Sequence, residues 1–114
     1  MNLPSVQRLS ADVGVTGQLS ADAMAWAAQS GFRSVVNNRP DFEGGPEQPT
    51  SAQIAVAAEA AGLRYAHLPV LPAAQTPEEI ARFAELLAEL PKPILAFCRS
   101  GTRSGRLFCA ATQG

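Results

Sequence analysis

Short apolar runs alternate along the chain with segments that carry helix start signals, and this alternation restricts the fold more than any other feature. The clearest run, 94–97 (ILAF), has no polar residue and is typical of a strand covered on both faces. The segment that begins at Thr76 has an N-cap threonine, a proline at the first helical position and two carboxylates in the first turn. Because parallel strands need long crossovers, the alternation predicts an α/β fold with a largely parallel sheet flanked by helices.

The remaining elements follow from capping residues, apolar spacing and β-branched runs. We expect strands within 7–18 and at 33–37, 64–70 and 94–97, with 64–70 buried as 94–97 is. We expect helices at 20–31, 50–61, 76–90 and 103–111. The segment 38–49 has three prolines and two adjacent glycines and is expected to be the largest loop. The 114 residues show no linker and no internal repeat, so 1–114 is expected to be a single domain.

Composition limits the classes of function that the chain could serve. Hydrophobic residues make up 46% and charged residues 17%, which is enough apolar material for one core. A net charge of -1 without a basic block argues against nucleic acid as a partner, and no apolar run is long enough to cross a membrane. We see no secretory signal, and two cysteines do not suggest a disulfide framework, so we expect a cytoplasmic protein.

The residues that can do chemistry gather at 98–103 (CRSGTR), between the apolar strand and the last helix. This is the carboxyl end of a central strand, where open α/β sheets bind ligands. A loop there can direct successive backbone N–H groups inward as an anion-binding nest, and the next helix adds its positive N-terminus. Gly101 permits a tight turn, and Arg103 can bind an anion through two N–H groups. Such a nest favours thiolate, so we expect Cys98 to have a lowered pKa and to be an activated nucleophile.

We therefore take Cys98 and Arg103 as the catalytic candidates. A cysteine at a strand end is also commonly a small core residue, but the complete loop favours catalysis. The expected anion-binding loop consists of Arg99, Ser100, Gly101, Thr102 and Ser104. Cys109 lies within the last helical segment among apolar residues, and we expect it to pack in the core; a resolving thiol is the other interpretation.

Four stretches of the chain resemble one family. They are 9–20 (LSADVGVTGQLS), 31–41 (GFRSVVNNRPD), 60–70 (AAGLRYAHLPV) with 76–79, and 97–104 (FCRSGTRS). The loop alone resembles the active loop of cysteine phosphatases and rhodaneses. Together the stretches resemble the small bacterial phosphatase-like sulfurtransferases related to the N-terminal domain of beta-lactamase hydrolase-like proteins, the DUF442 group, and 37–40 (NNRP) is the most discriminating mark. The resemblance implies a dual-specificity-phosphatase-like fold and a sulfur dioxygenase as partner or fusion.

The loop spacing and the upstream loop bear on the reaction. Cysteine phosphatases have five residues between the cysteine and the arginine, whereas Cys98 and Arg103 are separated by four, as in rhodanese-type sulfurtransferases. A shorter ring of amides should fit a single sulfur better than a phosphoryl group. Phosphatases also place an upstream aspartate to protonate the leaving alcohol, and 70–75 (VLPAAQ) contains no acid. We interpret Glu78 and Glu79 as helix N-terminal charges.

Three further residues have open roles. Arg39 could reach the face of the sheet that carries Cys98, and either a substrate contact or loop anchoring fits it. We expect Asn37 and Asn38 to fix the loop through Asx-type bonds, and His67, the single histidine, to be structural. One histidine and two separated cysteines cannot build a metal site, so we expect no metal and no cofactor.

The sequence thus predicts a sulfurtransferase with rhodanese-like activity. In this hypothesis the Cys98 thiolate takes sulfane sulfur from thiosulfate or a low-molecular-weight persulfide, and the resulting persulfide passes it to a thiol, sulfite or cyanide. Its partners would be a small anionic sulfur donor and a thiol-type acceptor. Two alternatives stay open: a cysteine-dependent tyrosine or dual-specificity-type phosphatase with a Cys98 phosphocysteine, and a non-catalytic module that binds an anion or a partner.

Overall fold

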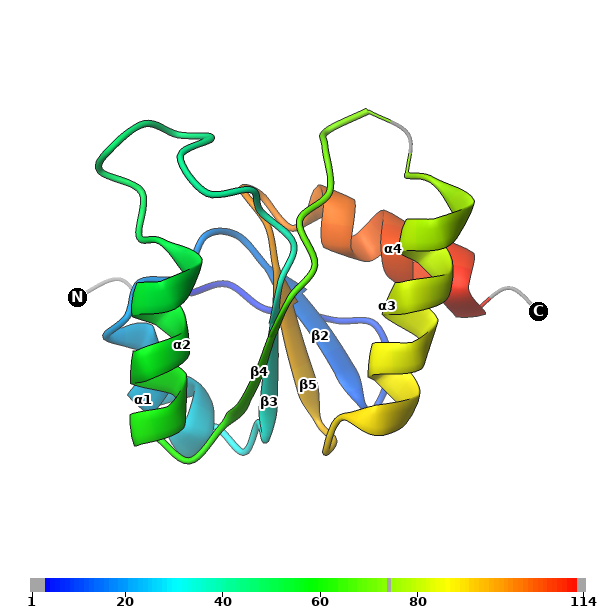
Figure 1. Ribbon diagram of the computed structural model, residues 1–114. Helices are drawn as coiled ribbons and strands as arrows, with labels where there is room; N and C mark the ends of the chain where they lie inside the picture. The colour runs from blue at the N-terminus through cyan, green and yellow to red at the C-terminus, as the bar shows by residue number, and fades with distance from the viewer. Residues whose placement is uncertain (1–3, 74, 113–114) are drawn as a thin grey trace.

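The computed structural model describes residues 4–73 and 75–112. A five-stranded sheet in the order β1-β2-β5-β3-β4 stands between two pairs of helices (Figure 1). The strands are β1 (Gln7–Arg8), β2 (Val13–Thr16), β3 (Ser34–Asn37), β4 (Arg64–His67) and β5 (Ile94–Phe97). The helices are α1 (Ala23–Gln29), α2 (Ser51–Ala60), α3 (Pro77–Glu89) and α4 (Thr102–Thr112). This is the predicted α/β class, with β2, β5, β3 and β4 parallel and only β1 antiparallel to its neighbour.

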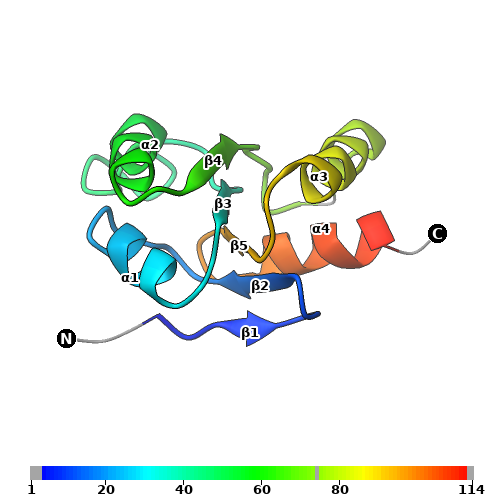
Figure 2. The same cartoon turned by 90° about the horizontal axis from the view of Figure 1, so that it is seen from below.

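The two faces of the sheet carry separate cores. Viewed from below, α1 and α2 lie on one side of the sheet, and α3 and α4 lie on the other (Figure 2). Alternation along the central strand divides its side chains, because successive residues point to opposite faces. Leu95 and Phe97 pack on the α1 and α2 side, whereas Ile94 and Ala96 pack on the α3 and α4 side. All four are fully buried, so β5 is the doubly covered strand that its apolar run predicts.

Two of the helices begin at complete capping boxes. The Thr50 hydroxyl accepts a hydrogen bond from the Gln53 N–H at 3.2 Å, and the Gln53 side chain accepts one from the Thr50 N–H at 3.0 Å. Thr76 and Glu79 make the same reciprocal pair at 3.1 and 2.8 Å. These bonds satisfy N–H groups that the first turn of a helix leaves without partners. They fix the starts of α2 and α3 at the predicted residues.

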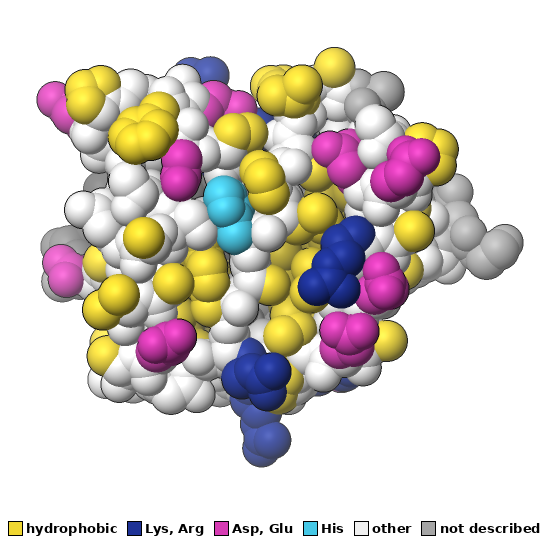
Figure 3. Space-filling view, in the orientation of Figure 1, with side chains coloured by type: hydrophobic (Ala, Val, Ile, Leu, Met, Phe, Trp, Pro, Cys, Tyr) yellow, Lys and Arg dark blue, Asp and Glu magenta, His cyan; other side chains and the backbone are white. Residues whose placement is uncertain are grey.

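Three expectations differ from the structure. The first helix begins at Ala23 with Asp22 at its N-cap, because Ser20 lies in a preceding turn in which its hydroxyl accepts from the Ala23 N–H. β4 is a partly exposed edge strand and not a buried one, since among the described strands it pairs with β3 alone. The space-filling view shows this edge, with the histidine at the surface beside apolar side chains (Figure 3). Cys109 is exposed on α4 and does not pack in the core.

No helix within the described ranges is both long and apolar enough to cross a membrane.

Candidate active site

The carboxyl ends of the parallel strands meet at one level. Thr16 on β2 and Asn37 on β3 are both register partners of Phe97 at the end of β5. The residues that follow these ends therefore emerge side by side, and Cys98 emerges between its neighbours. A ligand at this edge can be reached from three loops at once, which is why open α/β sheets bind there.

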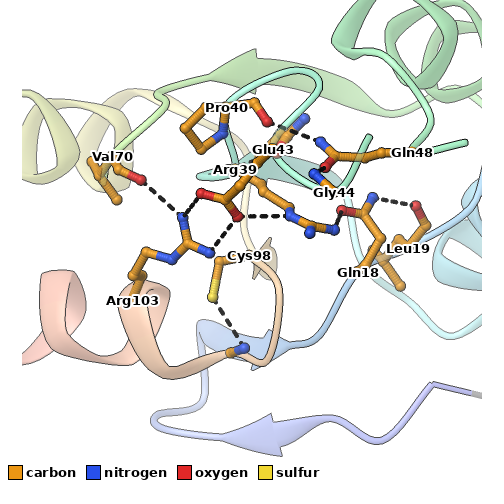
Figure 4. A network of polar contacts seen from close by, with 12 residues as sticks. Gln18, Leu19, Arg39, Pro40, Glu43, Gly44, Gln48, Val70, Cys98 and Arg103 are labelled. Atoms are coloured by element: carbon orange, nitrogen blue, oxygen red, sulfur yellow. Dashed lines mark hydrogen bonds and ion pairs between the residues drawn. The ribbon is translucent and has the colours of Figure 1, made fainter. Parts of the chain in front are cut away.

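A ring of backbone amides surrounds the Cys98 thiol. The thiol is fully buried, and its Sγ accepts a hydrogen bond from the Gly101 N–H at 3.0 Å (Figure 4). Burial raises the pKa of Cys98, but hydrogen bonds from the N–H groups of the loop oppose it, so that the pKa lies below the usual value of 9.0. The contributing amides are those of Ser104, Ser100, Arg103 and Gly101. Among the described residues only the Gly101 N–H meets hydrogen-bond geometry to Sγ, and the amides of Arg99 and Thr102 are not among those that lower the thiol pKa, so the full anion-binding loop stays a prediction.

Gly101 is required by the backbone of this ring. Its φ is 92°, in the left-handed region that residues with a side chain rarely adopt. A Cβ atom there would lie 3.4 Å from the backbone of Thr16, which is an ordinary contact, so the backbone conformation and not the lack of space calls for glycine. The loop turns here so that α4 can begin at Thr102 with its N-terminus beside the sulfur.

Asn38 joins the far end of the ring to the neighbouring strands. The Ser104 hydroxyl donates to Asn38 Oδ1 at 2.8 Å, and Asn38 Nδ2 donates to the Leu68 carbonyl at 3.0 Å. Asn37 Oδ1 accepts from the Arg39 N–H at 2.9 Å, which is the Asx-type bond that the sequence predicts. Each asparagine side chain thus binds a backbone group of another residue, and the Ser104 hydroxyl is used in its hydrogen bond to Asn38.

The Arg103 guanidinium lies beside Glu43 and Cys98, both of which raise its pKa, and its closest hydrogen bonds are to Glu43 and to a backbone carbonyl. Arg103 is 6% exposed, and its guanidinium donates from Nη1 and Nη2 to the two carboxylate oxygens of Glu43, at 2.8 and 2.7 Å. Nη1 also donates to the Val70 carbonyl at 3.0 Å. Arg103 is thus held in the floor of the site by a carboxylate that the sequence analysis did not single out.

Glu43 is the centre of an ionic cluster over the thiol. Hydrogen bonds from Arg103 lower the pKa of Glu43, burial opposes this, and Arg39 lowers it further, to about 2. Arg39 Nε donates to Glu43 Oε1 at 2.9 Å, and Arg39 Nη1 donates to Gln18 Oε1 at 3.0 Å (Figure 4). Glu43 is therefore ionised at neutral pH and cannot give a proton to a leaving group.

His67 has a structural position. Its Nε2 lies 2.9 Å from the Arg39 carbonyl oxygen, which fixes the chain at the point where Arg39 enters the site. Its interpretation as a hydrogen-bonded structural residue fits this contact. Arg39 is joined to Arg103 through Glu43, which fits its role as a loop anchor, and its substrate contact stays a prediction.

A cavity of about 750 Å³ opens above this cluster. It is lined by Arg39, Glu43, Gly44, Pro72, Arg99, Ser100, Thr102, Arg103 and Arg106. Among the described residues that line it, Glu43 is the only carboxylate, and the loop after β4 contributes only Pro72. Among the described residues of 70–75, only Pro72 lines the cavity, and it carries no acid.

The parallel sheet and the cysteine at the amide-lined end of its central strand define a class of protein, the enzyme domains with a cysteine-phosphatase-like fold. Within this class, a family model described as "Beta-lactamase hydrolase-like protein, phosphatase-like domain" matches residues 5–114. The chain belongs to this family, as its four resembling stretches predict.

Individual relatives agree with this assignment. A beta-lactamase hydrolase-like protein of Agrobacterium fabrum is 38% identical over 102 residues, which is 89% of this chain but 23% of that protein. The chain thus spans about a quarter of this curated relative. A crystal structure from Neisseria meningitidis, described as a "putative phosphatase", has a TM-score of 0.82 and 32% identity over 89% of this chain and 71% of that one. The active form of Tk-PTP shares the fold, with a TM-score of 0.66 and 20% identity over 95% of this chain and 80% of that one.

These descriptions bear on the predicted reaction. The family and the Neisseria structure are both described in terms of phosphatases. They support the phosphatase alternative better than the sulfur transfer that the sequence analysis put first.

Proposed function

We propose that this chain is a cysteine-dependent phosphatase domain that hydrolyses phosphomonoesters through a phosphocysteine on Cys98. The observation that carries the proposal is the buried Cys98 sulfur, which lies beside the Arg103 guanidinium and whose pKa is lowered by backbone amides of its own loop against the effect of burial. The descriptions of the family and of its solved relatives support phosphoryl groups as the transferred species.

The reaction divides into two displacements. The Cys98 thiolate attacks phosphorus, an S–P bond forms, and the P–O bond to the alcohol breaks with its electron pair leaving on oxygen. Water then attacks phosphorus, the S–P bond breaks, and phosphate leaves while the thiolate is restored. The inward amides and Arg103 stabilise the charge on the phosphoryl oxygens, because donors fixed in advance need no reorganisation. Arg39 and Arg103 together carry one more charge than Glu43, so the floor remains attractive to an anion.

The missing acid restricts the substrate class. A general acid typically contributes a factor of about 10² to 10⁴ to such a step. Glu43 is held ionised, and no other described carboxylate lines the cavity. We therefore expect phosphate esters of phenols, which leave readily as anions, to react at least about 10²-fold faster than esters of simple alcohols.

Sulfur transfer is the second candidate, and a specific observation favours it. Four residues separate Cys98 from Arg103, and the described residues of the facing loop supply no acid, which fits a leaving group that needs no proton. The thiolate would attack the outer sulfur of thiosulfate, the S–S bond would break, and sulfite would leave with the electron pair. A thiolate acceptor would then attack the outer sulfur of the Cys98 persulfide and restore the Cys98 thiolate.

One set of measurements separates these candidates. The protein is incubated with phenyl phosphate or with thiosulfate, and its intact mass and the released products are recorded. Phosphate release with a transient mass gain of one phosphoryl group supports the phosphatase. A stable gain of one sulfur atom, removed by cyanide, supports sulfur transfer and overturns the first proposal. If neither the phosphoryl nor the sulfur signal is seen, a module that only binds an anion or a partner is favoured.

Two cysteine variants make this test specific. Cys98→Ser should abolish the supporting signal, whereas Cys109→Ser, which alters an exposed thiol outside the ring, should retain it. A signal that survives in Cys98→Ser would contradict both covalent mechanisms.

A further inference from the structure

Two arginines at the rim of the cavity have no role in the reaction described so far. Arg99 and Arg106 are exposed residues that line the same cavity as Arg39 and Arg103. Within residues 4–73 and 75–112, neither side chain takes part in an ion pair or a hydrogen bond. Their guanidinium groups can therefore bind a ligand without breaking a contact within the described residues, whereas those of Arg39 and Arg103 are already paired with Glu43.

The arrangement of the chain places these two arginines close to the reacting sulfur. Arg99 directly follows Cys98, and its carbonyl accepts from the Gln18 N–H at 3.3 Å, which fixes its backbone against the loop after β2. Arg106 lies three residues after Arg103 on α4, so the two are neighbours on the helix surface. Arg103 turns into the floor toward Glu43, and Arg106 remains at the rim.

The cavity lining is strongly positive although the chain as a whole is slightly negative. The whole chain has a net charge of -1, yet four of its eight arginines line this cavity, together with one described carboxylate. Arg39 and Arg103 share Glu43, which leaves one excess positive charge in the floor and two more at the rim. A single phosphoryl group bound over Cys98 would be close to Arg39 and Arg103 and would not need Arg99 or Arg106.

The cavity size suits a small ligand. Its volume of about 750 Å³ lies within the range of about 300 to 1,000 Å³ that is usual for small-molecule sites. Such a ligand can place one group over the sulfur and extend another to the rim. Guanidinium groups bind carboxylate and phosphate oxygens through paired N–H donors.

We propose that Arg99 and Arg106 form a second anion subsite, and that the substrate is a small molecule with a carboxylate or phosphate in addition to its reacting group. This inference rests on the proposed function in placing the reacting anion over Cys98. The two rim arginines act as specificity residues, because they contact the part of the substrate that does not react.

Binding to a variant that cannot turn over tests the subsite without relying on catalysis. We would measure the calorimetric affinity of the Cys98→Ser protein for phenyl phosphate and for phenyl phosphates that carry a carboxylate at the meta or para position. We expect the better carboxylated ligand to bind about tenfold more tightly, as one charge-assisted contact would provide, which corresponds to about 1.4 kcal/mol.

Charge-matched variants locate the effect. Arg99→Gln and Arg106→Gln, each in the Cys98→Ser background, should reduce this preference. Arg64→Gln removes the same charge from an exposed residue at the start of β4, at the opposite end of the sheet, and should preserve it. An equal reduction in all three variants would show attraction by net charge alone and would overturn the subsite.

The outcomes distinguish this inference from the proposed function. If phenyl phosphate binds and neither carboxylate adds affinity, the subsite is wrong and the phosphatase proposal stands. If no aryl phosphate binds at all, the phosphatase proposal and the subsite both fail.

Discussion

Replacing Glu43 by glutamine tests the ionic cluster over the active thiol through the pH dependence of stability. The side chain keeps its shape, but Arg39 and Arg103 lose the only carboxylate that they share among the described residues. The pKa of Glu43 is lowered from 4.5 to about 2 by hydrogen bonds with Arg103, against an opposing effect of burial, and by Arg39. A carboxylate whose folded pKa is depressed stabilises the folded protein above its unfolded pKa.

The magnitude follows from the two pKa values. The difference between 4.5 and about 2 corresponds to about 3 kcal/mol at neutral pH when taken at full value. The Glu43 side chain is 21% exposed and sits in an exposed loop, so solvent screening reduces this to about 2 kcal/mol. This stabilisation should be complete above pH 4.5 and should be lost as the pH falls toward 2.

Urea unfolding of the wild type and Glu43→Gln at a series of pH values measures the effect. We expect the wild type to be more stable by about 2 kcal/mol at pH 7, and the two curves to converge between pH 4.5 and pH 2, because a protonated Glu43 resembles glutamine. Glu47→Gln is the control, since Glu47 is exposed in the same loop and should change stability by less than about 0.5 kcal/mol. Parallel curves for the wild type and Glu43→Gln over this pH range would refute the reasoning.

Three other predictions follow from the loop itself. The pKa of Cys98 lies below 9.0, since the amide bonds outweigh burial, so kcat/KM should stay high below pH 9; a loss of activity centred at pH 9 would contradict the ring. Asn38→Ala should lower the free energy of unfolding in urea by about 1 to 3 kcal/mol, because it strands the buried Ser104 hydroxyl, and an unchanged midpoint would show that the bond is unimportant. Gly101→Ala should lower the free energy of unfolding by about 1 to 3 kcal/mol, because the φ of 92° is unfavourable for alanine. It should also raise the pKa of the Cys98 thiol, measured by thiolate absorbance, and an unchanged pKa would show that the loop tolerates the new side chain.

The parts of the fold that sequence could predict are those that local chemistry determines. The capping residues Thr50 and Thr76 give the starts of α2 and α3, and the apolar run 94–97 gives the central strand. The loop 98–104 is also local, because its residues are consecutive and the strand before them sets their place. These predictions needed no knowledge of which elements become neighbours.

The parts that failed depend on tertiary neighbours. Arg64–His67 has the composition of a strand, but only the sheet order shows that it lies at an edge. Cys109 lies among apolar residues in sequence, yet the rotation of α4 turns it outward. Neither the order of the strands nor the rotation of a helix about its axis can be predicted from a short segment of sequence.

Glu43 could not be identified from the sequence, because it lies in an irregular loop with other acidic residues. It is one of three acidic residues in 38–49, and nothing in its spacing separates it from Asp41 or Glu47. It follows Phe42, whose φ of 64° is unusual for an aromatic residue and turns the chain at this point. A carboxylate between two arginines that are far apart in sequence becomes visible only when the loop 38–49, which carries Arg39 and Glu43, meets the start of α4, which carries Arg103.

The loop that carries Glu43 is braced internally by Gln48. Gln48 is 8% exposed, accepts from the Gly44 N–H at 2.7 Å and donates to the Pro40 carbonyl at 2.9 Å. The Gln48 side chain thereby connects Pro40 and Gly44, the residues on either side of the turn that carries Glu43. Anyone who exchanges this segment between related domains should transfer 40–48 as one block, since a hybrid that lacks the glutamine would keep the acidic residue but lose the brace that aims it.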